Sequence, residues 1–134
     1  MKKTIIHLLV VMSFLMTIAQ ATPLKKFSLN VKLDQAYVRI DGDKLIAGTG
    51  EIERCWKWGG NGLLTTSLKN LTNHQEWVTA PAKLDCDWSY KGFMPKNSAK
   101  LVSLTARKSL DGGFALKHIE LVAEIHYPQV AVKY

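Results

Sequence analysis

Apolar and polar residues alternate with a period of two through most of the chain, and this pattern predicts β-strands rather than helices. Phe27 to Leu33 is one such run, and Leu101 to Arg107 is another. Glycine, proline, asparagine or aspartate residues separate neighbouring runs, where turns are expected. Strands at this spacing predict an all-β fold, specifically an antiparallel β-sandwich. The other predicted strands cover residues 36–40, 44–47, 51–58, 63–69, 76–79, 114–127 and 129–134.

The stretch from Gly50 to Asn70 is the centre of this pattern. It contains two of the four tryptophans, one of the two cysteines and the densest cluster of glycines. Its two β-type runs flank the tetrapeptide Gly-Gly-Asn-Gly at 59–62. Glycine and asparagine accept the positive φ angles that tight hairpin loops require. We therefore expect a β-hairpin that turns at 59–62.

The longest predicted strand, 114–127, alternates almost without fault from His118 onward. Such a strand is long for a single straight element, so we expect a bend or bulge near Leu116. The last run, 129–134, reaches the end of the sequence within a strand pattern, so the domain is expected to be incomplete. One face of the long strand would carry Ile119, Leu121, Ala123, Ile125 and Tyr127, and the other His118, Glu120, Val122, Glu124 and His126.

Residues 1–21 have the organisation of a secretory signal-peptide helix. Lys2 and Lys3 form a positive segment near the start, Ile5 to Ile18 is apolar, and Ala19-Gln20-Ala21 fits the small-x-small cleavage rule. The apolar stretch is short for a membrane span, and an uncleaved anchor helix is the alternative interpretation. We expect a secreted or periplasmic protein with no stable membrane anchor after cleavage. Its mature part would be one β-sandwich domain over residues 22–134.

The chain is basic, with 18 lysines and arginines against 11 acidic residues and a formal net charge of +7. Basicity alone would be compatible with nucleic acid or another anionic surface. Beyond the signal segment, however, the basic residues are scattered, and only Lys25-Lys26 and Arg107-Lys108 are adjacent. This distribution predicts a solvated, mildly cationic surface and no nucleic-acid partner.

Export would place the two cysteines, Cys55 and Cys86, in an oxidising compartment, where a disulfide between them is permitted. Both lie close to tryptophans, so burial as two free apolar thiols is the alternative. The sequence does not decide between these possibilities. Neither cysteine has the neighbouring Cys-x-x-Cys or histidine pair that would predict a zinc site.

Two pairs of acids have a spacing that invites comparison with glycoside hydrolysis, which needs two carboxyl groups across a sugar. They are Asp85 with Asp87, and Glu51 with Glu53. Turn formation and solvation account for both pairs without a catalytic role, and we favour that interpretation.

The polar face of the long strand, with its histidines and glutamates, could hold a divalent ion at one end or the other. We interpret it instead as the solvated face of a sheet. The sequence contains no nucleophile elbow, phosphate loop or His-Glu-x-x-His motif. It therefore predicts no catalytic residue, no metal site and no cofactor.

Four tryptophans lie between residues 56 and 88. Flat indole faces stack on sugar rings, so exposed tryptophans in a secreted β-domain suggest carbohydrate as a partner. Trp56 and Trp58 would share one sheet face, where a core aromatic cluster is the favoured alternative. Trp88 and Tyr90 lie in an irregular loop and are the better candidates for sugar contact.

Several of these segments together resemble the opening of a known family. The run Ile52-Glu53-Arg54 followed by Trp56, the run 62–70 and Gln75-Glu76-Trp77 are similar to the start of the N-terminal β-supersandwich domain of α-galactosidase-type (family 36) glycoside hydrolases. Residues 118–128 and 130–134 resemble the strands that continue that sandwich. The resemblance covers most of the mature chain but only the front of the family's N-terminal domain.

The resemblance implies a larger exported enzyme whose catalytic aspartates lie on a downstream barrel domain, the expected partner of this segment. No catalytic residue can be transferred to a position of this sequence. In such enzymes the sandwich packs against the barrel and can border the substrate pocket, where Trp56, Trp58 and Trp88 would be candidate contacts. We therefore expect a non-catalytic N-terminal segment of a glycoside hydrolase acting in carbohydrate metabolism. The alternatives are a stand-alone secreted carbohydrate-binding β-domain and a structural or adhesive domain.

Overall fold

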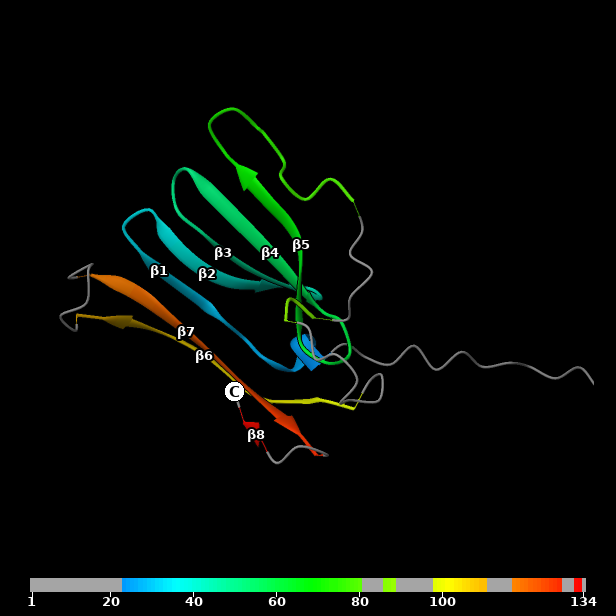
Figure 1. The fold of residues 1–134 in the computed structure, drawn as a ribbon. Coiled ribbons are helices and arrows are strands. Elements are labelled where there is room, and N and C mark those ends of the chain that lie inside the picture. Colours follow the sequence, from blue (N-terminus) through cyan, green and yellow to red (C-terminus); the bar gives the residue numbers. More distant parts are fainter. Residues whose placement is uncertain (1–22, 81–85, 89–97, 111–116, 129–131, 134) are drawn as a thin grey trace, which may run out of the picture.

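The computed structural model describes residues 23–80, 86–88, 98–110, 117–128 and 132–133, which form two antiparallel sheets (Figure 1). A short 3₁₀ helix, η1 (Pro23–Lys26), precedes them, and no helix in this part of the chain is long and apolar enough to cross a membrane. The first sheet has the order β1-β2-β3-β4-β5, and the second has the order β6-β7-β8. The strands are β1 (Asn30–Leu33), β2 (Ala36–Asp41), β3 (Lys44–Gly48), β4 (Ile52–Trp58), β5 (Leu63–Asn70), β6 (Lys100–Ser109), β7 (His118–Tyr127) and β8 (Val132–Lys133).

The strand register gives the first sheet two distinct faces, because directly paired residues point to the same side. We call the side that packs toward the second sheet the inner face, and the opposite side the outer face. Two rows of paired residues cross the inner face: Val38, Ala47, Arg54 and Leu68, and then Ile40, Leu45, Trp56 and Thr65. A row on the outer face contains Arg39, Ile46, Cys55 and Ser67.

A β-bulge in β5 changes which of its residues face inward. The register shifts between Cys55 and Trp56 of β4, so that Thr66 of β5 has no residue directly opposite. The Thr66 hydroxyl donates instead to the Cys55 carbonyl oxygen, at 3.3 Å. Because one extra residue interrupts the alternation, Thr65 and Leu68 both lie on the inner face.

The predicted hairpin is confirmed, and its turn contains a backbone bond from Gly59 N–H to the Gly62 carbonyl, at 2.8 Å. Gly60 has a φ of +111°, a conformation that residues with a Cβ rarely adopt. Gly62 is needed for close approach: a Cβ there would lie 2.5 Å from the Trp88 ring and 2.8 Å from the Cβ of Cys86. The glycine cluster therefore permits both the turn and the packing of residues 86–88 against it.

The apolar face predicted for the long strand is confirmed along β7. Ile119, Leu121 and Ala123 pack against the main core, and Ile125 and Tyr127 are only 1% and 0% exposed. The buried members of the main core come from η1 and both sheets: Leu24, Val38, Leu45, Leu63 and Leu104. The all-β, antiparallel, two-sheet prediction is therefore confirmed for the described residues.

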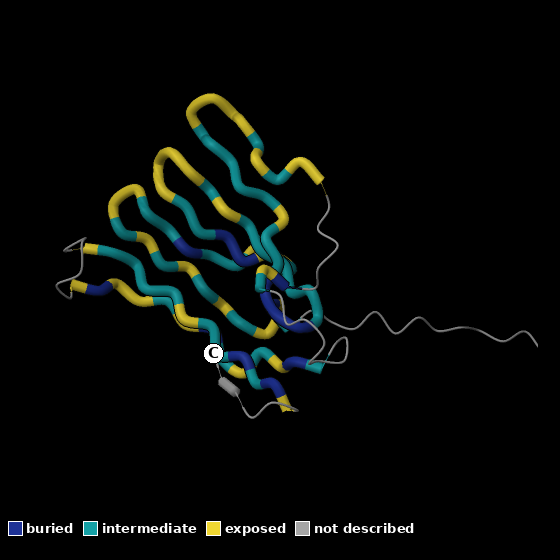
Figure 2. Tube along the Cα trace, in the orientation of Figure 1, coloured by how far each residue is buried: buried dark blue, intermediate teal, exposed yellow. Residues whose placement is uncertain are grey.

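The second sheet does not cover the first sheet evenly. Strands β6 and β7 lie against β1, and β7 also lies against β2. Strands β4 and β5 lie toward the opposite edge of the first sheet (Figure 1). Figure 2 shows that buried positions concentrate at the end of the molecule that holds the 59–62 turn and η1. The turns at the opposite end are exposed. The inner face of β4 is accordingly less well covered, and the side chain of Arg54 is 44% exposed.

One sequence-based expectation needs correction, and three others lie wholly or partly outside the described residues. The strand predicted at 76–79 is wrong: Glu76 forms only an isolated bridge to Lys69, and the residues after it are irregular. Its carboxylate, described below, is used on the edge of β5. The bend expected near Leu116, the signal-peptide helix at 1–21 and the last predicted strand before residue 132 lie outside the described residues.

Candidate functional site

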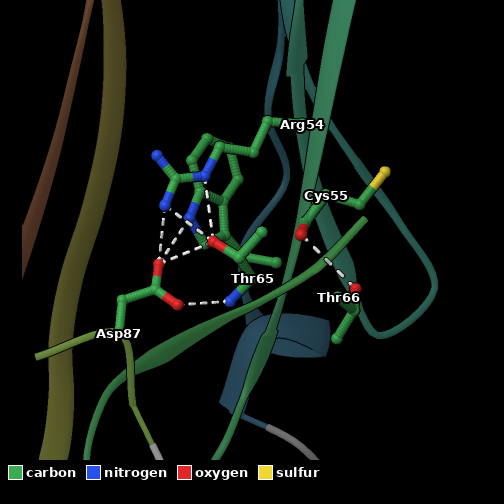
Figure 3. A network of polar contacts seen from close by, with 6 residues as sticks. Arg54, Cys55, Thr65, Thr66 and Asp87 are labelled. Atoms are coloured by element: carbon green, nitrogen blue, oxygen red, sulfur yellow. Dashed lines mark hydrogen bonds and ion pairs between the residues drawn. The ribbon is translucent and has the colours of Figure 1, made fainter. Parts of the chain in front are cut away.

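Among the described residues, an extensive polar network on the inner face is centred on the carboxylate of Asp87 (Figure 3). Oδ1 accepts from the backbone N–H of Thr65 at 2.5 Å. Oδ2 accepts from the Thr65 hydroxyl at 2.7 Å, from Arg54 Nη2 at 2.9 Å and from Trp56 Nε1 at 3.2 Å. We call these four residues the Asp87 network. It fixes the segment 86–88 across the inner face of β4 and β5.

Arg54 is held by more than its ion pair with Asp87. Its Nε and Nη2 atoms donate to the Thr65 hydroxyl oxygen at 2.9 and 2.7 Å. Its guanidinium carbon also lies 4.8 Å from the ring centre of Trp56, which places the cation over the indole face. The planar guanidinium is therefore stacked and hydrogen-bonded in one position, a geometry that lysine could not reproduce.

A second carboxylate acts on the same strand. Glu76 accepts from the Ser67 hydroxyl at 2.5 Å and from the backbone N–H groups of Leu68 and Val78, each at 2.9 Å. The Ser67 hydrogen bond, followed by those from the Val78 and Leu68 N–H groups, lowers the pKa of Glu76 from 4.5 to about 2. Asp87 and Glu76 thus both accept hydrogen bonds from backbone N–H groups of β5. These N–H groups lie along the edge of β5 that faces away from β4, where a further strand would otherwise pair.

Asn61 joins the hairpin turn to the second sheet. Its side-chain Oδ1 accepts from the Ser98 N–H at 3.0 Å, from the Ser98 hydroxyl at 3.3 Å and from the Ala99 N–H at 3.2 Å. Its backbone carbonyl accepts from the Tyr127 hydroxyl at 2.7 Å, and Tyr127 in turn accepts from Trp88 Nε1 at 2.9 Å. We call Asn61, Trp88 and Tyr127 the intersheet tie, because they connect β4–β5, the 86–88 segment and β7.

The outer face of the first sheet has a separate polar cluster around Glu53. The Tyr37 hydroxyl donates to Glu53 Oε2 at 2.5 Å, and Arg39 Nη1 lies 3.8 Å from the same oxygen. The Cys55 thiol lies 3.8 Å from Glu53 Oε1. Burial, and then the hydrogen bond to Glu53, raise the pKa of Tyr37 above its ordinary value of 10.0. Burial, and then the charge of Glu53, raise the pKa of Cys55 above 9.0, so this thiol is a poor nucleophile.

The two cysteines are separate thiols in the structure. The thiol of Cys55 lies on the outer face and points away from the Asp87 network (Figure 3). Cys86 is buried beside Gly62, and its thiol donates to the Trp88 carbonyl oxygen at 2.6 Å. Of the two possibilities left open by the sequence, the structure contains the pair of partly or fully buried thiols.

The aromatic residues proposed for sugar contact have different surroundings. Trp58 and Trp88 are half-buried and pack against the main core and against a second buried cluster of Ala99, Ile125 and Tyr127. Trp88 also belongs to the intersheet tie. Trp56 is half-buried beneath Arg54 and borders the cleft described below. Tyr90 lies outside the described residues. Sugar contact by these residues stays a prediction.

The candidate carboxylate and metal-binding residues mostly have structural partners. Asp87 and Glu53 are engaged as described above, Glu51 is exposed, and Asp85 lies outside the described residues. On β7, Glu120 pairs with Arg107, and Glu124 accepts from Ser103. Within the described residues, no group of three or more histidine, cysteine, aspartate or glutamate side chains is placed to hold a metal ion.

A cleft of about 580 Å³ opens on the inner face next to the Asp87 network. One wall is formed by β2, β3, β4 and β5, and the beginning of β7 forms the other. Its floor is apolar, and its rim carries Arg54, Lys117 and His118. This cleft is the candidate binding site of the described part of the chain.

The sequence identified Trp56, Cys55 and Asp87 as candidate residues. It did not predict the contacts that these side chains make with residues distant in the sequence. The signal that could have indicated the Asp87 network is the placement of an arginine and a tryptophan two residues apart on one strand face, opposite a threonine.

Comparisons with protein-family models, with curated proteins and with solved structures gave no match for this chain. The functional interpretation therefore depends on the site's own geometry and on the resemblance in sequence.

Proposed function

We propose that this chain is the front part of the N-terminal β-sandwich of an exported, α-galactosidase-type glycoside hydrolase, with a structural rather than a catalytic role. The observation that carries the proposal is that the residues bearing the family resemblance form one connected unit. Arg54 donates to the Thr65 hydroxyl and stacks on Trp56, and Glu76 accepts from β5. Motif residues that interlock in this way have the role expected of a structural signature.

The hydrogen bonds of the Asp87 and Glu76 carboxylates support a non-catalytic role. A glycosidase needs one carboxyl group that can donate a proton and a second that can attack or activate water. Asp87 accepts four hydrogen bonds, and Glu76, with its pKa lowered to about 2, stays ionised at neutral pH. Glu76 therefore has no proton to donate at neutral pH, and the carboxylate of Asp87 is engaged by Thr65, Arg54 and Trp56.

The uneven covering of the first sheet supports a partner domain. The second sheet lies against β1 and β2, and the inner face beyond them opens into the cleft. An apolar sheet surface of this kind is usually covered in a stable protein. In the proposed enzyme a downstream catalytic barrel would pack nearby and would supply the catalytic aspartates. Export through the segment 1–21 belongs to the same proposal.

The second candidate function is a stand-alone secreted carbohydrate-binding domain. The placement of Trp56 beside the cleft favours it, because an indole at the edge of a cleft could stack on a sugar ring. The packing of Trp58 and Trp88 against the core argues against a broad aromatic platform. We therefore rank this function second.

Two assays on the purified chain distinguish these functions. The first function predicts no release of nitrophenol from a nitrophenyl α-galactoside and no saturable binding to a panel of galactosides. Saturable galactoside binding that is lost in Trp56→Ala but retained in Trp77→Ala would favour the carbohydrate-binding domain. Trp77 is a suitable control because it is 43% exposed and does not line the cleft. Hydrolysis by the chain alone would contradict both.

A further inference from the structure

The apolar surface of the cleft supports the proposed partner domain, but that structural role does not use the basic residues at its rim. Its floor is formed by Val38, Ala47 and Leu68 of the first sheet, and Ile119 of β7 faces them. Its volume, about 580 Å³, lies in the range of small-molecule binding sites, roughly 300–1,000 Å³. The size and the aliphatic lining together fit a compact ligand with an apolar body.

The described rim of the cleft carries basic side chains. Arg54, Lys117 and His118 line it, and none of the described lining residues is an aspartate or glutamate. Arg54 is fixed there by Asp87 and by stacking on Trp56, so its position does not depend on a ligand. Lys117, on the opposite wall, is exposed. Asp87 offsets part of the charge of Arg54, so Lys117 is the main source of the attraction that the rim exerts on small anions.

The lining also discriminates between kinds of anion. A sugar or a sugar phosphate has many hydroxyl groups, and each would lose hydrogen bonds to water against an aliphatic floor. A ligand with one anionic head and an apolar body would keep its head at the rim and bury the remainder. We propose that the cleft binds a small organic anion of this class, an aromatic or medium-chain aliphatic carboxylate or sulfonate. This proposal does not depend on the proposed glycosidase parent.

Two fluorescent probes test the proposal with the purified chain. Anilinonaphthalene sulfonate has an aromatic body with an anionic head, and phenylnaphthylamine is its uncharged counterpart. We expect saturable one-to-one binding of the sulfonate, displacement by decanoate, and binding at least fivefold tighter than that of the amine. Absence of saturable binding, or equal affinity for the two probes, would overturn the proposal.

Variants locate the binding and separate charge from shape. Lys117→Glu should weaken sulfonate binding roughly fivefold and leave amine binding unchanged. The matched reversal Lys100→Glu, which lies opposite His126 at the far end of β7, should change neither. Ala47→Phe, which fills the floor, should abolish binding of both probes. Near-UV circular dichroism checks each fold, and if Ala47→Phe does not fold, the two lysine variants decide. Equal effects of the two lysine reversals would contradict binding in this cleft.

Discussion

At the scale of single residues, the hydroxyl of Tyr127 makes a contact that no local pattern in the sequence specifies. The side chain is fully buried, and its oxygen lies between Trp88 Nε1 and the carbonyl of Asn61. One oxygen therefore satisfies a donor and an acceptor from two separate segments of the chain. Polar groups buried in this way destabilise the fold strongly when their partner is removed.

Tyr127→Phe should lower the free energy of unfolding by about 2 kcal/mol, because it leaves the Trp88 N–H and the Asn61 carbonyl without this partner. Tyr37→Phe is the matched control, since its hydroxyl bonds Glu53 on the half-buried outer face. The control should lose less than about 1 kcal/mol, because water can replace the bond there. Urea denaturation measures both values. Equal losses in the two variants would contradict the intersheet tie.

Glu76 predicts a defined dependence of stability on pH. Its pKa is lowered from 4.5 to about 2 in the folded chain, so the contribution of its carboxylate is fully present above pH 4.5. This contribution is lost as pH falls toward the folded-state pKa. Glu76→Gln should therefore be less stable than the natural chain at pH 7, and the difference should shrink progressively between about pH 4.5 and 2. A difference that is constant over this range, measured by urea denaturation, would contradict the assignment.

At the scale of elements, the outer edge of β5 is closed by carboxylates instead of a neighbouring strand. Asp87 accepts the Thr65 N–H and Glu76 accepts the Leu68 N–H. The Asp87 and Trp77 N–H groups donate back to the carbonyls of Leu63 and Leu68. An edge occupied in this way is less available for pairing with another chain.

Asp87→Ala should remove the hydrogen bond to the Thr65 N–H and leave the hydrogen bond from the Leu68 N–H to Glu76 in place. The Thr65 amide should exchange its hydrogen at least tenfold faster, whereas the Leu68 amide, which is held by Glu76, should keep its protection. Hydrogen exchange followed by NMR measures both amides in one experiment. Equal acceleration at both positions would indicate global destabilisation, and unchanged exchange at Thr65 would refute the role of Asp87.

The strands could largely be predicted from the sequence, but the contacts of the candidate site could not. Alternation identified the pattern of β1 to β7 and the inward face of β7, because a half-buried strand imposes a period of two. The bulge at Thr66 escaped prediction, since one extra residue leaves the local alternation intact on either side. The prediction of a strand at 76–79 is wrong because Glu76 binds β5 mainly through its side-chain carboxylate and not through a ladder of backbone hydrogen bonds. The hydrogen bonds to Asp87 and those of Tyr127 join residues more than twenty positions apart, and periodicity contains no information about such contacts.

At the scale of the whole molecule, the two sheets cover each other unevenly. The cleft and several exposed apolar side chains, among them Val102 and Val122, remain on the described surface. We infer that a neighbouring domain covers part of this surface in the proposed enzyme. The chain alone should therefore associate through its apolar surface.

Association should appear as a melting transition that depends on protein concentration, together with an apparent mass above that of the monomer in light scattering. A neutral osmolyte and moderate salt should not abolish it, because the contacts are apolar. A sharp, reversible transition of a monomer at every concentration would contradict the inferred neighbour.

The most direct test of the central claim is to read the gene in frame beyond the codon of Tyr134. The account predicts further sandwich strands followed by a barrel domain that carries the catalytic aspartates, and removal of those aspartates should abolish α-galactoside hydrolysis by the complete protein. A stop codon directly after Tyr134, or α-galactoside hydrolysis by the purified chain itself, would contradict it.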